Sequence, residues 1–309
     1  MDIHKYLREG GNPDELEQHL MDLDSTFRFK CRRCGKCCKN QDTIIFTPRD
    51  IYNIAHKFGK SMEQVIEETS EVYPGRDSRM PIVHMVPRGP KNACPLLVDG
   101  RCSVHDCKPT VCALFPLGRV VWFDRTLPLE QQLDNIQVRY IVNDIDCGSA
   151  KRVNTVREWL ARFGIAEDDE FFIRWNRLFI RTSSVMRKLE EAHCPPALLV
   201  VFWRTVYKDF YLNYDTSKAF MPQFLSMADQ VEPLIRELYA PPIHRGDPNT
   251  GGTICKNRNR SVIRHRSSAM THVAVLWRRS VTGFTWTACI CSLWHTIRTG
   301  RRVSAIPTT

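Results

Sequence analysis

Four cysteines within eight residues near the beginning of the chain constrain its fold more than any other feature. They are separated by two, two and no residues, and a glycine follows the second, in the order Cys31, Cys34, Gly35, Cys37, Cys38. Two thiolates two residues apart can bind one metal ion in a reverse turn, whose backbone N–H groups can also point at the sulfurs. Glycine permits the tight turn that such wrapping requires. The spacing therefore predicts a segment that folds around a metal.

Positively charged side chains surround this first cluster, namely Arg32, Arg33, Lys36 and Lys39. Positive charge favours the thiolate over the thiol and offsets part of the negative charge of a site made of several thiolates. The composition around the cysteines is therefore consistent with metal binding.

A second set of cysteines follows in a proline-rich part of the chain: Cys94, Cys102, Cys107, Cys112 and Cys147. Residues 73–116 contain seven prolines, a density that excludes a long helix. Metal binding can contribute on the order of 10 kcal/mol to the folding of such a segment. We therefore expect thiolates from both stretches to converge on metal and to keep the proline-rich region ordered.

Thirteen cysteines and the absence of a secretory signal or a long apolar run indicate a reducing compartment. Residues 1–24 are polar and acidic, and no run approaches the ~18 apolar residues of a membrane helix. The sequence therefore predicts a cytoplasmic protein without a membrane span, in which clustered thiols bind metal rather than form disulfides.

The net charge of +10 comes entirely from the last part of the chain. Residues 241–309 hold eleven Lys and Arg and one acid; removing these from the totals of 44 and 34 leaves 33 of each sign. A neutral body argues against nucleic acid as a partner. The tail is interpreted either as a disordered basic segment or as a non-native sequence read in the wrong frame, and no function is assigned to it.

Helical periodicity dominates after residue 154. Helices are expected from Asn154 to Gly164, over Glu167–Glu191, from Pro196 to about Leu212, and from a Ser217 cap to Tyr239. Upstream, capping patterns predict short helices at 13–23, 48–59 and 62–68. Short strands are expected at Val120–Phe123 and Gln137–Val142.

These patterns predict a mainly α fold with minor β structure and an irregular, metal-stapled cysteine-rich region. Residues 1–150 are expected to form a cysteine-cluster metal-binding domain. Residues 151–240 are expected to form a helical region packed on it, and residues 241–309 the basic tail.

In five stretches the sequence resembles the YkgJ-like cysteine-cluster (CxxCxxCC) family, described as a zinc- or iron-chelating domain. Residues 29–38, FKCRRCGKCC, resemble its opening motif, and Thr47-Pro48-Arg49-Asp50 the helix start that follows. Residues 94–97 and 102–116 resemble its second block, and residues 146–148 its last cysteine. The helical part is similar to that of bacterial members. The sequence departs from the pattern at His105, Lys108 and the additional Cys107.

The resemblance implies eight metal ligands: Cys31, Cys34, Cys37, Cys38, Cys94, Cys102, Cys112 and Cys147. These could hold one cluster and one zinc ion, two four-cysteine sites, or one site with spare thiols. Cys107 is interpreted as a surface thiol or an auxiliary ligand, His105 as an exposed side chain, and Cys194 as a buried or boundary thiol.

Three functions remain open from the sequence. The first is an iron–sulfur protein for redox chemistry or electron transfer, since four-cysteine ligation suits such clusters. The second is a structural or sequestering zinc protein, because four thiolates bind zinc equally well. The third is a relative of flagellin lysine N-methylase, although no glycine-rich nucleotide loop follows a strand. The protein or redox partner is unknown, and whether the chain is an enzyme stays open.

Overall fold

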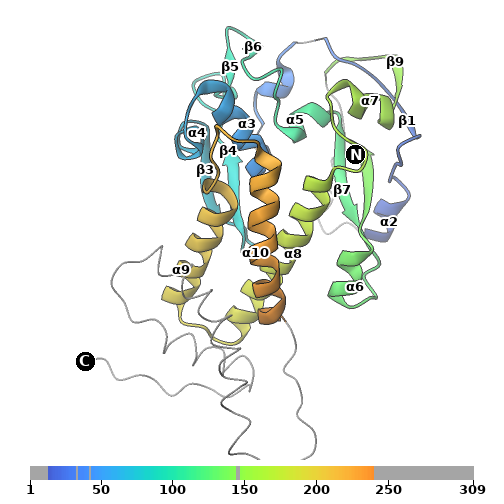
Figure 1. The fold of residues 1–309 in the computed structure, drawn as a ribbon. Coiled ribbons are helices and arrows are strands. Elements are labelled where there is room, and N and C mark those ends of the chain that lie inside the picture. The colour runs from blue at the N-terminus through green and yellow to red at the C-terminus, as the bar shows by residue number, and fades with distance from the viewer. Residues whose placement is uncertain (1–12, 33, 42, 144–146, 240–309) are drawn as a thin grey trace, which may run out of the picture.

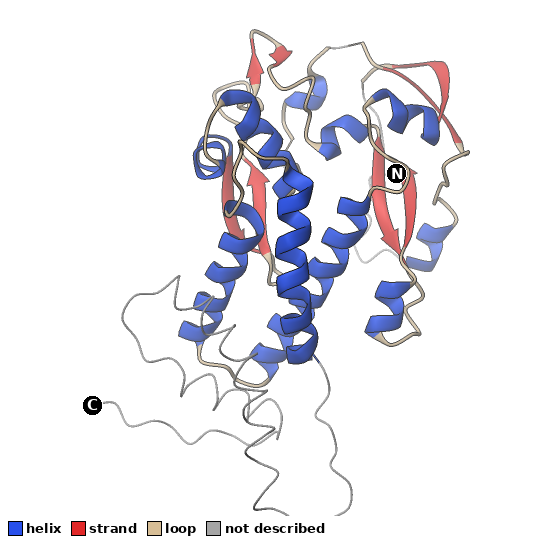
Figure 2. Ribbon diagram, in the orientation of Figure 1, coloured by secondary structure: helices blue, strands red, loops and turns tan. Residues whose placement is uncertain are grey.

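A computed structural model describes residues 13–32, 34–41, 43–143 and 147–239. In this part of the chain, helices and four small antiparallel sheets are interleaved (Figures 1 and 2). The structure is 46% helical and 20% strand, so it is a mixed α/β fold. The expectation of a mainly α fold is therefore wrong.

The cysteine-rich half alternates short helices with short strands. In chain order these are α2 (Pro13–Glu17), β1 (Thr26–Lys30), the 3-10 turn η1 (Lys36–Cys38), β2 (Ile45–Phe46), α3 (Pro48–Phe58), α4 (Met62–Thr69), β3 (Ser70–Pro74), β4 (Pro81–Met85), β5 (Leu97–Val98), β6 (Arg101–Cys102), α5 (Thr110–Leu114), β7 (Leu117–Trp122), α6 (Leu129–Asp134), β8 (Gln137–Val142) and β9 (Ser149–Thr155).

The second half is helical, as its periodicity predicts. Its elements are α7 (Val156–Arg162), α8 (Glu170–Glu191), α9 (Pro196–Tyr207), the π-helical turn η2 (Lys208–Leu212) and α10 (Phe220–Tyr239). The last helix begins at Phe220, three residues beyond the expected Ser217 cap. The Ser217 hydroxyl instead donates to Asp215 Oδ1 in the preceding turn, at 2.6 Å.

Capping residues define α3 and α4 where the sequence places them, whereas the helix expected at 13–23 ends at Glu17. Thr47 begins α3 and Ser61 begins α4, each through a reciprocal capping box with the residue three positions later, Asp50 and Gln64. Gly59 ends α3 in the left-handed conformation at φ 62°.

The strands of the cysteine-rich region account for the error in fold class. β1 pairs with β9, β4 lies between β2 and β3, and β5 pairs with β6. Only two strands were expected, over 120–123 and 137–142, and they correspond to the paired strands β7, which ends at Trp122, and β8. The strands that were not expected contain two to seven residues. β1 pairs with a strand more than a hundred residues away, so the local sequence pattern did not reveal them.

Two clusters of buried apolar side chains hold these elements together. The larger joins α3, α4 and β4 to α8, η2 and α10, and Ile51, Val83 and Phe224 within it are fully buried. The smaller joins β1, α5, β7, β8 and α7 around Trp159, whose ring packs edge-on against Phe27. No helix within the described ranges is long and apolar enough to span a bilayer.

Candidate metal centre

Backbone hydrogen bonds bring the first cysteine cluster against the second. Cys94 N donates to Cys38 O at 2.8 Å, and Asn40 N donates to Asn92 O at 2.8 Å. Lys39 and Ala93 form an isolated antiparallel bridge between these bonds. The backbones of the two distant stretches therefore lie side by side at this point.

The β5–β6 hairpin closes over the same place. Leu97 pairs with Cys102 across the hairpin, and Leu97 N donates to Cys94 O at 2.9 Å. At its turn, Gly100 O lies 3.7 Å from where a Cβ on Gly35 would stand. Because Gly35 has φ 71°, the chain can turn into η1 close to this hairpin.

Four thiols at this junction affect one another electrostatically. A hydrogen bond from Cys38 holds the pKa of Cys37 near 6, helped by the charge of Lys108. The same hydrogen bond, burial and the charges of neighbouring thiolates raise the pKa of Cys38. Burial, together with the charges of Cys102 and Cys37, raises the pKa of Cys94. The side chains of Cys37, Cys38, Cys94 and Cys102 therefore share one electrostatic environment.

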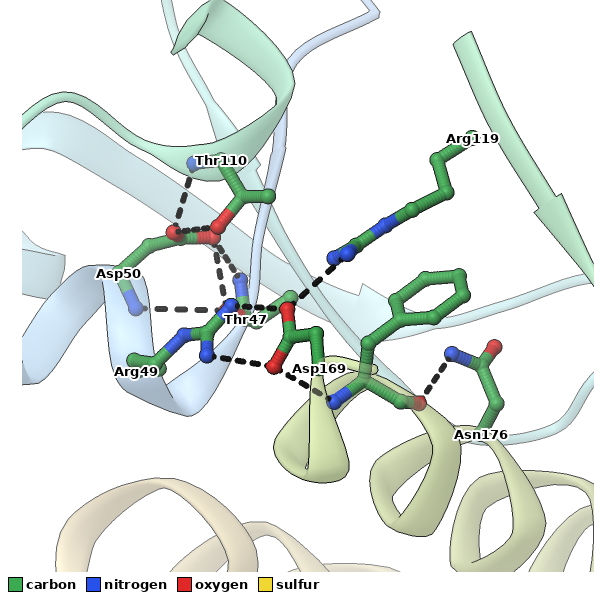
Figure 3. A network of polar contacts seen from close by, with 8 residues as sticks. Thr47, Arg49, Asp50, Thr110, Arg119, Asp169 and Asn176 are labelled. Carbon is green, nitrogen blue, oxygen red and sulfur yellow. Dashed lines mark hydrogen bonds and ion pairs between the residues drawn. The ribbon is translucent and has the colours of Figure 1, made fainter. Parts of the chain in front are cut away.

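Cys112 belongs to the same environment from the opposite side, on α5. Burial raises the pKa of its thiol, and so do the charges of Cys94, Asp50 and Cys102. Its helix is held by Asp50, which accepts hydrogen bonds from Thr110 N at 2.8 Å and from Thr110 Oγ1 at 2.9 Å (Figure 3). Asp50 therefore connects the start of α3 directly to the turn that presents Cys112.

An ion-pair network continues from α3 to α8 and β7 (Figure 3). Arg49 binds both oxygens of Asp169 at 2.8 and 2.7 Å, and Arg119 Nη1 donates to the same carboxylate at 2.9 Å. Asp169 also begins α8 by accepting from Phe172 N. Both guanidinium groups lie over aromatic rings, Arg119 at 3.6 Å from the centroid of Phe172. This network joins the helical half of the chain to α3, the helix whose Asp50 positions the turn that carries Cys112.

A second group of thiols lies where β1 meets β9. Lys30 pairs with Ser149, so Cys31, one residue beyond the end of β1, and Cys147, two residues before the start of β9, lie just outside the paired ends of these strands. Gly148 makes this approach possible, because a Cβ there would lie 2.4 Å from Phe29 Cε2 and 2.9 Å from Lys30 O. Apolar packing between Phe29 and Phe115, with ring centroids 5.8 Å apart, connects this group to the end of α5.

The side chains of the described cysteines are not arranged at the distances that binding of a shared metal ion requires. Sulfurs that share a tetrahedral zinc ion lie roughly 3.8 Å apart, given Zn–S bonds of ~2.3 Å. Across the described residues, no three His, Cys, Asp or Glu side chains lie close enough together to hold a metal ion as they stand. The donor set nevertheless suits zinc or iron, because thiolates are the ligands these metals share in closed sites.

Comparison with known proteins identifies this part of the chain. Residues 30–134 match the CxxCxxCC family model, described as a "putative zinc- or iron-chelating domain". We call residues 30–134, the part of the chain that is similar to this family model, the CxxCxxCC domain. The resemblance seen in the sequence is therefore confirmed, and this description agrees with zinc or an iron–sulfur cluster as the bound group. Neither the comparison with curated proteins nor that with solved structures gave a match.

Exposure divides the eight candidate ligands of the CxxCxxCC domain. Cys31, Cys34 and Cys37 are exposed, whereas the thiols that close the junction are half-buried: Cys38, Cys94, Cys102 and Cys112. Cys147 is half-buried and lies beyond the matched residues, so its place in the set rests on the resemblance of residues 146–148 to the last cysteine of the family.

The remaining thiols have different surroundings. Cys107 is half-buried and packs on the larger apolar cluster. Burial raises its pKa, as does the charge of Asp106, which forms an ion pair with Lys57. His105 is exposed. Cys194 is 7% exposed at the junction of α8 and α9, and burial raises its pKa to about 11.

The polar support of the CxxCxxCC domain was not foreseen from the sequence. The capping pattern identified Asp50 as a helix residue, but its bonds to Thr110 join two motifs sixty residues apart. The sequence did hold a signal for this contact, because Thr47-Pro48-Arg49-Asp50 and Thr110 both belong to the motifs quoted above. Asp169 falls within the helix expected over Glu167–Glu191, and its pairing with Arg49 and Arg119 was not predicted.

Proposed function

We propose that this chain is an iron–sulfur protein for electron transfer whose eight cysteines form two four-thiolate sites. The inner site consists of Cys38, Cys94, Cys102 and Cys112. The outer site consists of Cys31, Cys34, Cys37 and Cys147. We also propose that residues 1–150 carry both sites and residues 151–240 support them, in a reducing compartment such as the cytoplasm.

The observation that supports electron transfer is the exposure of the outer thiols. Cys31, Cys34 and Cys37 are exposed on one edge of the domain, where a partner can approach them. An iron–sulfur cluster, when bound, supplies one-electron transfer, and its potential depends on solvent exposure and on hydrogen bonds to the sulfurs. The hydrogen bond between the Cys37 and Cys38 thiols joins the outer site to the inner one.

A specific observation also favours zinc for the inner site. Its four thiols are all half-buried, and they are closed in by the Cys94–Cys38 backbone bond and by the β5–β6 hairpin. A closed four-thiolate zinc ion has no open position for chemistry and contributes directly to folding. The second candidate is therefore a structural zinc ion in the inner site.

The methylase alternative receives no comparable support. All strand pairs in the described ranges are antiparallel, in four separate small sheets. A nucleotide site of the doubly wound kind would require parallel strands.

Anaerobic purification followed by metal and sulfide analysis tests the proposal. We expect iron and acid-labile sulfide with visible absorption that bleaches on reduction. Zinc in both sites, without colour, would support the second candidate alone and remove the redox function. Protein that carries neither metal after anaerobic preparation would contradict both.

Single cysteine variants test the division into two sites. Cys102→Ala is expected to lose the inner metal and to keep the outer one, and Cys31→Ala the reverse. Cys194→Ala is the matched control, because this thiol lies outside both sites and should leave the metal content unchanged. Loss of all metal from either variant would indicate one shared site instead of two.

A further inference from the structure

Basic segments lie next to the exposed thiols, with Asp99 and Asp146 directly adjoining two of them in the sequence. Residues 25–41 contain six Lys or Arg and no acid, and neither residues 86–98 nor 147–157 contain an acid. The structure brings these three segments together through the β1–β9 pairs and the Lys39–Ala93 bridge. We call the following exposed residues the basic collar: Arg28, Lys30, Arg32, Lys39, Lys91 and Lys151.

The charge of the basic collar is directed to solvent. None of its six residues forms an ion pair with another described residue. Three carboxylates outside these segments are paired with other cations, Asp24 with Arg157, Asp106 with Lys57, and Glu68 with Lys60, whereas Asp99 is exposed at the turn of the β5–β6 hairpin. Along β1 the phenylalanines face the core, so Arg28 and Lys30 point outward together. Figure 1 shows β1, β9 and the β5–β6 hairpin at one end of the molecule.

The positive charge of the basic collar exceeds the negative charge that two four-thiolate metal sites would carry. A zinc ion with four thiolates has a formal charge of −2, so two such sites would carry −4 against the six positive charges of the collar. Lys36 and Lys108 stand nearer to the cysteines and add to the positive side. Surplus charge of one sign on one face accelerates association with a partner of opposite sign.

We infer that the basic collar is the docking surface for a protein partner that presents a carboxylate-rich face, and that it guides this partner to the outer thiols. This inference rests on the proposed metal function. Electron-transfer partners form small, short-lived interfaces in which charge complementarity determines orientation and rate. The collar lies next to the exposed thiols, so a partner bound there would contact the edge of the outer site.

Nucleic acid fits this surface less well. Proteins that bind single strands place exposed aromatic rings between their cations. Among the described residues, the exposed large apolar side chains are mostly aliphatic, and the aromatic ones, Phe58 and Tyr73, lie on α3 and β3 outside the collar. Phosphates would also approach the negatively charged thiolates.

Charge reversal in the full-length chain tests the inference. The collar variant carries Arg28→Glu, Lys91→Glu and Lys151→Glu, three exposed positions that are not adjacent to a cysteine. The control carries the same change of charge at exposed positions on other elements, Arg76→Glu, Arg187→Glu and Arg204→Glu. The probes are a fluorescein-labelled polyglutamate peptide and an oligouridine of matched charge, measured by anisotropy at several salt concentrations.

We expect the collar variant to bind polyglutamate about tenfold more weakly than the control, with a smaller salt dependence. Equal affinity of the collar and control variants would overturn the inference, as would tighter collar-dependent binding of oligouridine. If the reversed chain fails to fold, the same three positions changed to Gln are compared with the three control positions changed to Gln, and weaker polyglutamate binding than in that control is expected.

Metal analysis of the same samples separates the two proposals. The affinity difference between collar and control variants reports on the docking surface whether or not metal is bound. The metal content of the parent chain reports on the proposed function. Parent protein that binds metal while both variants bind polyglutamate alike would therefore remove the docking surface and retain the metal sites.

Discussion

Asp50 uses both of its carboxylate oxygens to join two motifs of the CxxCxxCC domain. One oxygen accepts from Thr47 N at 2.9 Å and from Thr47 Oγ1 at 2.7 Å, and the other from the two donors of Thr110. The side chain is 2% exposed, so water cannot replace these bonds. A single buried residue therefore begins α3 and also positions the helix that carries Cys112.

Asp50→Asn is expected to lower the free energy of unfolding by about 2 kcal/mol and to weaken metal binding at the inner site. An amide presents one acceptor oxygen and one NH2 group, so one threonine would face a donor instead of an acceptor. Urea unfolding and the metal content after purification provide the measurements. Asp124→Asn is the matched control, because Asp124 accepts the same kinds of bonds from Thr126 in an exposed turn and should change stability by less than about 0.5 kcal/mol.

Gly148→Ala is expected to destabilise the chain by about 2–3 kcal/mol, because φ is +73° and the new methyl group would overlap Phe29 and the Lys30 carbonyl. Gly89→Ala has nearly the same φ, +72°, with no atom within 4 Å, so it isolates the backbone strain, about 1 kcal/mol. Thermal unfolding of both variants separates the two effects. Equal losses would mean that Gly148 is needed for its φ alone and not for the approach of Cys147 to Cys31.

At the scale of elements, helices were predictable and most strands were not. The capping boxes at Thr47 and Ser61 are local signals, and the structure contains both. The strand over residues 26–30 alternates polar and apolar residues, but its partner lies at residues 149–155. A strand of five residues has no stability without that partner, and the sequence alone does not say which segment supplies it.

The candidate site, like the fold, was predictable from the sequence only in part. The cysteine motifs predicted that the backbones of the two cysteine-rich stretches meet, and the eight-ligand set itself stays a prediction. The motifs did not predict that Asp50 and Thr110 would join them, nor that exposure would separate the outer thiols from the inner ones. Contacts of this kind depend on how α3, α5 and α8 pack, which no local pattern encodes.

Arg181 holds α8 to α6 and faces α10 at the wall of a cleft of about 500 Å³ lined by charged side chains. It is 1% exposed and binds Glu130 through Nε at 3.1 Å and Nη2 at 2.8 Å. Arg181→Met is expected to cost about 2–3 kcal/mol, less than the ~3–5 kcal/mol of a fully buried pair, because Glu130 stays 36% exposed to water. Arg236→Ala, which removes an exposed contact to the same Glu130, should cost less than about 1 kcal/mol in the same unfolding experiment.

Asp169 joins α8 to α3 and β7, and its pKa determines how this junction responds to acid. Burial raises the pKa of Asp169, but the hydrogen bonds and charges of Arg49 and Arg119 outweigh it and hold the pKa below its ordinary value of 3.8. A group with a lowered folded pKa stabilises the protein above its unfolded pKa and loses that contribution as the pH falls through its folded pKa.

Asp169→Asn is therefore expected to destabilise the chain near pH 7 by about 2 kcal/mol and to make its stability less dependent on pH below about 4. The measurement is denaturant unfolding of the variant and the parent across this range, compared as a difference so that acid effects on the thiolates are shared. A difference that stays constant down to pH 2 would show that the Asp169 pKa is not lowered in the folded chain.

At the scale of the whole molecule, two kinds of interaction hold different parts of the chain. The helices α8 and α10 belong to the larger apolar cluster, in which Leu178 and Phe224 are fully buried. The cysteine-rich part depends less on this cluster, because the described residues of 31–38 are exposed or half-buried, and the second set of thiols reaches the cluster through Leu96, Val104 and Cys94. Metal–thiolate bonds would therefore stabilise the second part much more than the first.

Removal of metal by a chelator is expected to loosen the cysteine-rich segments and to leave the helical core folded. Amides at the Cys38–Cys94 and Asn40–Asn92 pairs and in the β5–β6 hairpin should exchange much faster with deuterium, whereas those of α8 and α10 should change little, because apolar burial persists without metal. Hydrogen exchange with mass spectrometry on metal-loaded and metal-free protein measures this, and Cys194→Ala should show the same contrast as the parent. Uniform loss of protection would mean that metal binding and the helical core fold as one unit, and unchanged exchange around Cys94 would mean that the backbone pairing there does not depend on metal.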